Sequence, residues 1–311
     1  MKLPAQLPPD ACWLPFSGTS RELRAWHSQH AADYALRPGA PRGVRLHTDA
    51  VDPRAHYARW RLLGESDAAP VANANWCVAL DPVVLAADQT DVRIMQWPVS
   101  DLAADAAQAL ATDVAVHLRD DDDPRIAGAT LWQACATRWY LLGAGQAPDI
   151  RNVQPERVIG QALRDFPTDG ADAALWRRIS TEIQMLFHAH SRNAQRQASG
   201  LTAVNGLWWF GTASLPGSLQ TLAMPELVGS DALWRGCWRA HGAHDQVRME
   251  DSAQPAVAGV ALGGHVGETL PRALAALAGG DIAAVVIDAD GDTLTLARPS
   301  LLQRLTNRLR A

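Results

Sequence analysis

A predicted helix over residues 172–190 carries a polar face that could bind a small molecule. Its apolar residues recur at helical spacing and form one stripe: Leu175, Ile179, Ile183, Leu186 and Phe187. At about 100° per residue, four polar residues fall together on the opposite face: Arg177, Thr181, Gln184 and His188. Arginine can hold an anion through its guanidinium group, and histidine changes its charge near neutral pH. We therefore take this face as one wall of a candidate ligand site.

Two asparagines that follow this helix complete the candidate site. Asn193 lies just beyond the helix end, and Asn205 lies near the start of the next predicted strand. On one interpretation, these residues hydrogen-bond backbone groups together with Gln184 and His188, as buried polar side chains must. On the other, all four line a polar pocket, with Arg177 available for an anion. The first interpretation predicts that His188→Ala destabilises the fold, and the second that it leaves stability almost unchanged.

The histidines do not indicate a metal site. On a helix, residues two apart point about 200° apart, so His188 and His190 cannot share one metal ion. Residues 241–245 (His-Gly-Ala-His-Asp) could ligate a metal from a loop, but a surface loop without metal fits their polar surroundings better.

Two acidic segments are better explained as turns and loops than as cation sites. Residues 120–123 are four consecutive aspartates, which repel one another and are typical of a solvated loop. Residues 288–292 read like the opening of a calcium-binding loop, but Pro299 stands where that loop needs its glutamate. Asp and Gly favour tight turns, so this segment predicts a hairpin. We expect no bound metal and no cofactor.

The remaining composition excludes several classes of protein. The cysteines Cys12, Cys77, Cys135 and Cys237 are too widely spaced for a zinc site, which favours free thiols in a reducing compartment. The net charge of −5 gives no basic surface for nucleic acid. Residues 1–9 do not read as a signal peptide, and the apolar segment 282–287 is far too short to span a bilayer. We expect a cytoplasmic protein without a membrane or nucleic-acid partner.

Several familiar catalytic signatures are absent from the sequence. It contains no G-x-S-x-G elbow, no phosphate-binding G-x-x-x-x-G-K-[ST] loop, no G-x-G-x-x-G fingerprint and no H-E-x-x-H pair. Their absence argues against the corresponding serine hydrolases, nucleotide triphosphatases, dinucleotide-binding dehydrogenases and zinc proteases. The catalytic residues, if there are any, are unknown from the sequence.

A longer pattern resembles a known family. Residues 175–193 read Leu-Trp-Arg-Arg-Ile-Ser-Thr-Glu-Ile-Gln-Met-Leu-Phe-His-Ala-His-Ser-Arg-Asn, and residues 204–209 read Val-Asn-Gly-Leu-Trp-Trp. Over residues 76–235 this pattern is similar to RpfE-type regulatory proteins, which are described as similar to cofactor-independent phosphoglycerate mutases. The Asp81-Pro82 pair, residues 138–141 and Leu215-Pro216 fit as well. The resemblance implies a phosphoglycerate-mutase-like scaffold and a regulatory role.

The chain lacks several residues of the RpfE-type pattern and the metal-binding Asp-His pair of the mutases. Val84 replaces a histidine, Ser191-Arg192 replace Pro-Val, and a glycine triplet is reduced to Gly211-Thr212-Ala213. The mutases use two metal ions and an Asp-His pair, which would stabilise the attacking and leaving oxygens of phosphoryl transfer. No Asp-His dipeptide occurs in this sequence. The resemblance thus implies the scaffold without two-metal catalysis.

The elements that must position these residues alternate between strands and helices. Residues 1–70 form a less regular N-terminal part with predicted helices over 20–34 and 54–63. Strands are predicted over 76–80 and 92–95 with a turn or short helical connector over 81–88, and one strand or paired strands over 132–142. A helix over 101–111 with Ser100 as its N-cap precedes a possible strand over 113–118. A short helix ends near Gly200, and the apolar run 207–210 predicts a central strand buried on both faces.

The C-terminal third continues the same alternation. Residues 240–256 are polar and predict a loop. We expect strands over 257–262, 281–287 and 293–297, and helices over 269–278 and 299–310. Together these elements predict a single α/β domain over residues 1–311, with helices on both faces of a sheet, of the alkaline-phosphatase or phosphoglycerate-mutase kind.

The sequence favours a regulatory or ligand-binding protein over an enzyme. Its partner would be a small molecule or a protein whose identity the residues do not specify. Two alternatives remain open: an active metal-dependent phosphate-ester hydrolase or phosphomutase, and a scaffold for protein interaction. The metal content separates the first alternative from the favoured interpretation, and a stoichiometric protein partner would indicate the second.

Overall fold

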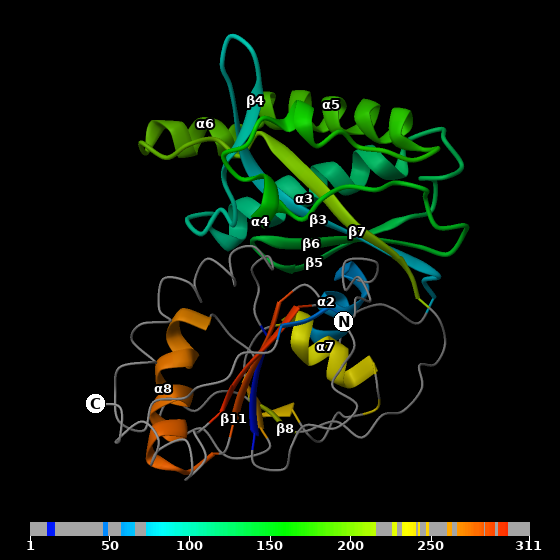
Figure 1. Ribbon diagram of the computed structural model, residues 1–311. Coiled ribbons are helices and arrows are strands. Elements are labelled where there is room, and N and C mark those ends of the chain that lie inside the picture. Colours follow the sequence, from blue (N-terminus) through cyan, green and yellow to red (C-terminus); the bar gives the residue numbers. More distant parts are fainter. Residues whose placement is uncertain are drawn as a thin grey trace. The chain divides into compact units, whose positions relative to one another are not determined.

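The computed structural model describes residues 57–65 and 73–215 and shorter segments elsewhere, namely 11–15, 46–48, 226–228, 232–240, 242, 247–248, 260–262, 266–282, 284–289 and 292–297. The chain forms two compact units (Figure 1). One comprises residues 54–219, and the other combines residues 1–53 with residues 220–311. The expectation that all 311 residues form a single domain stays a prediction.

The unit over residues 54–219 is built on an antiparallel sheet around the long strand β3 (Trp76–Ala87). On one side β3 pairs with β7 (Gly206–Ser214), and on the other with β6 (Arg138–Gly143) and β4 (Val92–Gln96). Strand β5 (Thr130–Cys135) continues the sheet beyond β6. Of the two alternatives for residues 132–142, one strand or paired strands, the β5–β6 hairpin confirms the paired strands.

Alternate residues of β3 contribute to two different cores, because successive side chains of a strand point to opposite faces. Trp76, Val78 and Leu80 pack with α3 (Ala104–Arg119) and α5 (Ala173–Ala189). Cys77 and Ala79 pack with α2 (Tyr57–Glu65). Within this unit, the two alternating sets of β3 side chains therefore pack against different helices. Shorter helices are α4 (Pro155–Val158), η2 (Leu163–Asp165) and α6 (Ser191–Ala198).

Two local predictions in this unit are wrong. Residues 81–88 are not a connector, because β3 runs through Asp81-Pro82 without a break. The missing N–H of Pro82 is tolerated because β6 pairs only with residues 76–79 of β3, and β4 begins pairing only at Val84.

The segment 113–118 is not a strand either. It is the second half of α3, in which Val114 and Leu118 continue the buried face of Leu110 at intervals of four residues. This helix begins at Ala104 with Ala103 as its N-cap, so Ser100 does not cap it. The Ser100 backbone N–H instead donates to the Pro98 carbonyl in a turn.

Strand β7 is buried on both faces, as its unbroken apolar run predicts. Leu207 and Trp209 belong to the core under α3 and α5, Phe210 belongs to the core under α2, and Trp208 is half-buried. Its expected central position is wrong, because within the described residues β7 pairs with β3 alone (Figure 1). An unbroken apolar run indicates that both faces of a strand are buried by other elements. It does not indicate whether the strand is central in the sheet or at its edge.

One glycine of β7 allows α2 to approach the sheet. Gly211 has a positive φ of 67°, and a Cβ atom there would lie 2.8 Å from the backbone nitrogen of Ala58. Only glycine combines this backbone conformation with so close an approach. The first member of the reduced glycine triplet therefore has a packing role in this structure.

The other unit contains a seven-stranded sheet in the order β2-β12-β11-β1-β10-β8-β9. The strands of its parallel part are β1 (Ala11–Pro15), β8 (Glu226–Val228), β9 (Val247–Arg248), β10 (Val260–Leu262) and β11 (Ala284–Ala289). Antiparallel β12 (Asp292–Ala297) and β2 (Leu46–Thr48) extend one edge. Its helices are α7 (Ala232–Ala240) and α8 (Val266–Gly279), and α8 contacts β1 and β11.

Most expectations for the C-terminal third are confirmed. The helix over 269–278 is α8, and the strands around residues 288–292 form the β11–β12 hairpin, in which Ala289 pairs with Asp292. The expected loop over 240–256 contains the short strand β9, whose two residues are too few to show a period. The helices expected over 20–34 and 299–310 lie outside the described residues. Among the helices that are described, none is long and apolar enough to cross a membrane.

Candidate functional site

Helix α5 presents the predicted polar face to solvent. Ile179, Ile183 and Phe187 of the apolar stripe are fully buried. The four polar residues on the other side are all exposed: Arg177, Thr181, Gln184 and His188. The Thr181 hydroxyl donates to the Arg177 carbonyl one turn earlier at 2.9 Å. The helical period thus placed these side chains correctly, and their role in binding stays a prediction.

Asn193 has a structural role next to α5. Its side chain is 2% exposed, and its amide donates to the carbonyls of Phe187 and Val204 at 2.8 and 2.7 Å. Its side-chain oxygen accepts from the Val204 backbone N–H at 2.9 Å. Asn193 therefore fixes the end of α5 to the segment that leads into β7, because these bonds satisfy backbone groups that are cut off from water.

Asn205 makes a similar connection near the C-terminal end of β3. Its amide nitrogen donates to the Leu85 carbonyl at 2.7 Å, and its side-chain oxygen accepts from the Leu85 backbone N–H at 2.6 Å. It thereby pairs with β3 just before β7 begins. The six candidate residues therefore separate into two asparagines bound to backbone and four residues on an exposed helix face.

This separation predicts different changes in the free energy of unfolding for Asn193→Ala and His188→Ala. Asn193→Ala is expected to lower the free energy of unfolding by about 1–3 kcal/mol, because it leaves buried backbone groups without partners. His188→Ala is expected to change it by less than about 0.5 kcal/mol, because the side chain is exposed. Urea denaturation of both variants measures the difference. If His188→Ala and Gln184→Ala both clearly destabilise the chain, the exposed face is structural.

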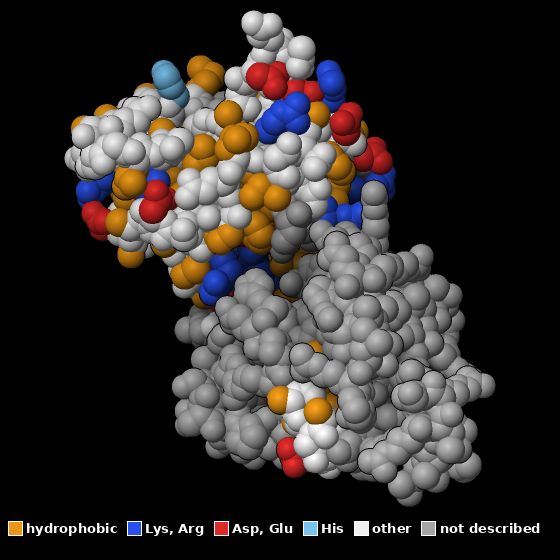
Figure 2. All heavy atoms as spheres, turned by 60° about the vertical axis from the view of Figure 1, so that its left-hand side comes forward, with side chains coloured by type: hydrophobic (Ala, Val, Ile, Leu, Met, Phe, Trp, Pro, Cys, Tyr) orange, Lys and Arg blue, Asp and Glu red, His pale blue; other side chains and the backbone are white. Residues whose placement is uncertain are grey.

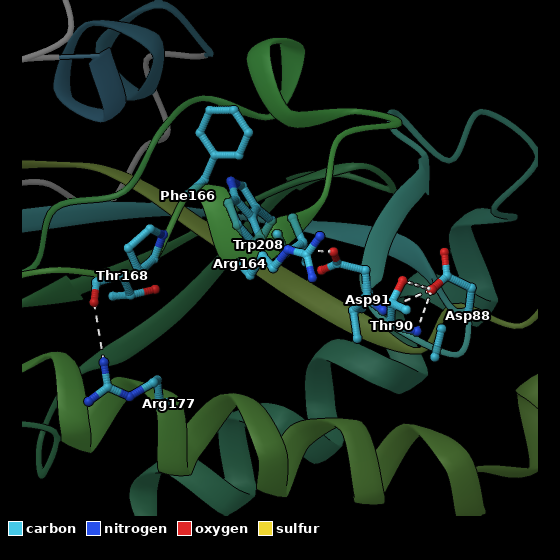
Figure 3. A pocket seen from close by; sticks show the side chains of 12 residues that line it. Asp88, Thr90, Asp91, Arg164, Phe166, Thr168, Arg177 and Trp208 are labelled. Atoms are coloured by element: carbon cyan, nitrogen blue, oxygen red, sulfur yellow. Dashed lines mark hydrogen bonds and ion pairs between the residues drawn. The ribbon is translucent and has the colours of Figure 1, made fainter.

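A cavity opens beside the N-terminal half of α5 and includes one of the six candidates, Arg177. Its volume is about 510 Å³, within the usual range for small-molecule sites. The hairpin between β3 and β4, η2 with the segment that follows it, and single residues of α5 and β7 form its walls (Figure 3). The lining residues that can interact with a ligand are Asp88, Thr90, Asp91, Arg164, Phe166, Thr168, Arg177 and Trp208.

The two arginines of this cavity are held differently. Arg177 donates one hydrogen bond, from Nη1 to the Thr168 carbonyl at 3.3 Å, and within the described part of the chain no carboxylate pairs with it. The Nε atom of Arg164 lies 3.0 Å from Oδ2 of Asp91, while 65% of the Arg164 side chain is exposed. Arg177 thus keeps most of its donors available, since a guanidinium group has five N–H bonds.

The acidic wall of the cavity is formed by the β3–β4 hairpin. Asp88 accepts from the backbone N–H groups of Thr90 and Asp91 at 2.8 Å and from the Thr90 hydroxyl at 2.9 Å. Hydrogen bonds from the Thr90 backbone N–H, the Thr90 hydroxyl and the Asp91 N–H lower the pKa of Asp88 to about 2. Asp88 is therefore charged at neutral pH and is committed to shaping the hairpin.

Two aromatic side chains complete the cavity. Trp208 is held by a hydrogen bond from its Nε1 to the Val153 carbonyl at 2.8 Å and by contacts with buried Val83 and Ile94. Phe166 is half-buried against the same cluster. Sequence reasoning missed Arg164, Asp91 and both aromatic residues as site residues, since they belong to three separate segments. The 12 tryptophans among 311 residues are a signal of large aromatic surfaces, but their number does not distinguish Trp208 from the core tryptophans.

The aspartate run over residues 120–123 borders a second cavity of about 600 Å³. Asp121 is not simply solvated: its side chain is 5% exposed and receives two hydrogen bonds from Arg178. Hydrogen bonds from Arg125 lower the pKa of Asp123 to about 2. Figure 2 shows acidic and basic side chains beside one another on the described surface. The described residues contain no group of three or more side chains suited to holding a metal ion.

The three cysteines whose side chains the structure describes show no catalytic arrangement. Cys77 and Cys237 are buried, Cys135 is half-buried, and all three are free thiols, as their spacing predicts. Burial raises the pKa of Cys77 to about 12, which suppresses the reactive thiolate. The predicted surface loop over 241–245 falls, apart from Gly242, outside the described residues, as does the side chain of Cys12.

A buried network of charged side chains joins α2 to the sheet. Asp81 is fully buried and accepts from Nη1 and Nη2 of Arg61, each at 2.7 Å, and from Nε1 of Trp97 at 3.0 Å. The Nε atom of Arg61 donates to the Tyr140 hydroxyl at 2.7 Å, and that hydroxyl donates to Glu65 at 2.6 Å. Burial opposes the charge of Arg61, but the Asp81 carboxylate outweighs it and raises the pKa of Arg61.

The solved structures that are similar to this chain include two at low sequence identity. A cofactor-independent phosphoglycerate mutase from Thermoplasma acidophilum DSM 1728 is 12% identical with a TM-score of 0.41, over 94% of this chain and 90% of that chain. The PH0037 protein from Pyrococcus horikoshii is 11% identical with a TM-score of 0.49, over 95% and 88%. The sequence matches no protein-family model and no curated protein. The resemblance to RpfE-type proteins stays a prediction, while the structural neighbours of this chain include a phosphoglycerate mutase.

Proposed function

We propose that this chain is a regulatory or ligand-binding protein whose small-molecule ligand carries an anionic group and binds in the cavity between Arg164 and Arg177. The observation that carries the proposal is Arg177, which lines the cavity and, within the described residues, has no carboxylate partner. An arginine with free donors beside a concave surface is suited to a carboxylate or phosphate group. The RpfE-type sequence pattern supports the regulatory part of the proposal.

Binding without two-metal catalysis is favoured by the donors that the chain offers. Phosphoryl transfer of the mutase type needs several carboxylate and histidine ligands around two metal ions. The sequence lacks the Asp-His pair, and the described residues contain no cluster of three such side chains. The net charge of −5 is consistent with a small-molecule partner and argues against nucleic acid. A cytoplasmic location is part of the same proposal.

Titration calorimetry with inorganic phosphate tests this function. Arg177→Ala is expected to weaken phosphate binding by about tenfold, because it removes a charge-assisted hydrogen bond. Arg157→Ala is the matched control, since Arg157 is an exposed arginine that does not line the cavity. EDTA is expected to change neither the phosphate affinity nor the thermal midpoint of unfolding.

Two results would contradict the proposal. If the Arg177→Ala variant binds phosphate as tightly as the unmodified chain, the cavity is not the anion site. Loss of phosphate binding together with a lower thermal midpoint after EDTA treatment would instead favour the metal-dependent phosphate-ester enzyme, because a bound metal stabilises the folded state.

A further inference from the structure

We infer that the cavity beside α5 binds a nucleoside monophosphate, with the phosphate group at Arg177, the base against Phe166 and Trp208, and a donor group of the nucleoside at Asp88. This inference rests on the proposed function and specifies its ligand. It combines three properties of the cavity wall, which are a cation with free donors, two aromatic side chains and an exposed carboxylate.

The cation and the acidic residues lie at opposite ends of the cavity. In Figure 3, Trp208 and Arg164 lie between Arg177 on one side and Asp91, Thr90 and Asp88 on the other. An anion alone would be attracted by Arg177 but repelled by the two carboxylates. A ligand that is anionic at one end and rich in hydrogen-bond donors at the other suits both ends, and a nucleoside monophosphate has this polarity.

The aromatic residues provide a surface for a planar group. Trp208 is fixed in place by its hydrogen bond to the Val153 carbonyl and by packing on Val83, so it loses little conformational freedom when a ligand binds. Phe166 lies beside it in the cavity wall. Nucleobases stack favourably on such side chains, because every base has a flat π face. A ligand without a flat ring would leave this apolar part of the wall uncovered.

Asp91 contributes negative charge to this end of the cavity, but its carboxylate is closed to a ligand. Its side chain is only 3% exposed, and its buried Oδ2 lies 3.0 Å from Nε of Arg164 as an ion pair. Asp88 at the same end is 51% exposed. Oδ1 of Asp88 shapes the hairpin, whereas its Oδ2 receives one long hydrogen bond, from Nε of Arg93 at 3.4 Å. A hydroxyl or amino group of a nucleoside can therefore donate to Oδ2 of Asp88.

Calorimetric titration with four probes tests the inference: AMP, adenosine, ribose 5-phosphate and inorganic phosphate. AMP is expected to bind at least about tenfold more tightly than ribose 5-phosphate, because the base adds a stacking contact. It is also expected to bind at least about tenfold more tightly than adenosine, because the phosphate adds the contact to Arg177.

Two variants test where the base and the phosphate of the ligand bind in the cavity. Phe166→Leu is expected to weaken the binding of AMP and adenosine by about fivefold while leaving ribose 5-phosphate unchanged. Arg177→Ala is expected to weaken AMP and ribose 5-phosphate and to leave adenosine unchanged. Arg157→Ala should alter none of the affinities, and unchanged thermal midpoints establish that each variant is folded.

The outcomes separate this inference from the proposed function. If ribose 5-phosphate binds as tightly as AMP and Arg177→Ala weakens both, the nucleotide inference is wrong and the anion site stands. If adenosine binds as tightly as AMP, the phosphate does not reach Arg177 and the inference is also wrong. If no probe binds in a manner that depends on Arg177, the proposed function itself is wrong.

Discussion

Asp81→Ala is expected to lower the free energy of unfolding by about 3–5 kcal/mol, because it leaves a buried arginine without its counter-charge. Both Nη atoms of Arg61 bond to the Asp81 carboxylate, and the side chains are 5% and 0% exposed. Water cannot replace the lost partner at these exposures. The substitution also leaves Nε1 of Trp97 without its acceptor. Urea denaturation followed by far-ultraviolet circular dichroism measures the change.

Two further variants show whether the loss comes from the unpaired charge. Asp122→Asn removes an exposed carboxylate and is expected to change stability by less than about 0.5 kcal/mol. The double variant Arg61→Met with Asp81→Leu removes both charges and is expected to recover more than half of the loss, because a buried ion pair can often be replaced by apolar side chains at little cost. A loss below about 1 kcal/mol for Asp81→Ala would show that the pair does not hold α2 to the sheet.

Trp176→Ala is expected to destabilise the chain by about 3–5 kcal/mol, the usual loss for a large aromatic side chain removed from a core. Trp176 is 1% exposed and packs edge-on against Trp209, with ring centroids 4.4 Å apart. It lies on α5, so its removal opens a cavity between that helix and β7. Thermal and urea denaturation measure the effect, which should appear as a lower midpoint with an unchanged dependence on urea concentration.

A matched pair of conservative substitutions separates ring packing from hydrogen bonding. Nε1 of Trp176 is buried without a hydrogen-bond partner among the described residues, whereas Nε1 of Trp209 donates to the Ser180 hydroxyl at 2.8 Å. Trp176→Phe is therefore expected to cost less than Trp209→Phe, with a difference of about 1 kcal/mol. Equal losses for the two variants would mean that the Trp209–Ser180 hydrogen bond contributes nothing measurable.

Features that depend on neighbouring residues in the sequence could be predicted from local patterns alone. The 3.6-residue period of α5 separated its buried stripe from Arg177, Thr181, Gln184 and His188 without any knowledge of its neighbours. The Asp-Gly turn after residue 288 determined the β11–β12 hairpin in the same way. These features depend on residues within a few positions of one another, so the sequence displays them directly.

Hydrogen bonds and ion pairs between residues far apart in the sequence could be found only from the tertiary structure. Asp81 looked like part of a turn because its partners, Arg61 and Trp97, lie 20 and 16 residues away. Position 81 follows Cys77 and Ala79 on the face of β3 that meets α2, and the sheet therefore directs its carboxylate toward that helix. No periodicity within residues 76–88 contains this information.

The N-terminal part shows the same division between local and long-range information. Residues 1–70 lacked a clear period and predicted little regular structure, yet β1 lies between β10 and β11 in the sheet formed with the C-terminal third. A five-residue strand is too short to display an alternation, and its pairing partners are about 250 residues away in the chain. Its place in the sheet depends on hydrogen bonds that form only after the chain ends meet.

For the candidate site too, some features follow from local sequence and others depend on the fold. The helix period was sufficient to place Arg177 on an exposed face, and the element boundaries placed Asn193 and Asn205 at element ends. The sequence left open whether the asparagines bond to backbone or line a pocket, and the folded chain shows that they bond to backbone. That Arg177 shares a cavity with Asp91 and Trp208 is visible only in the folded chain. The helix period reaches along one element, whereas a concave surface needs side chains from several elements, and their meeting depends on how the sheet and helices pack.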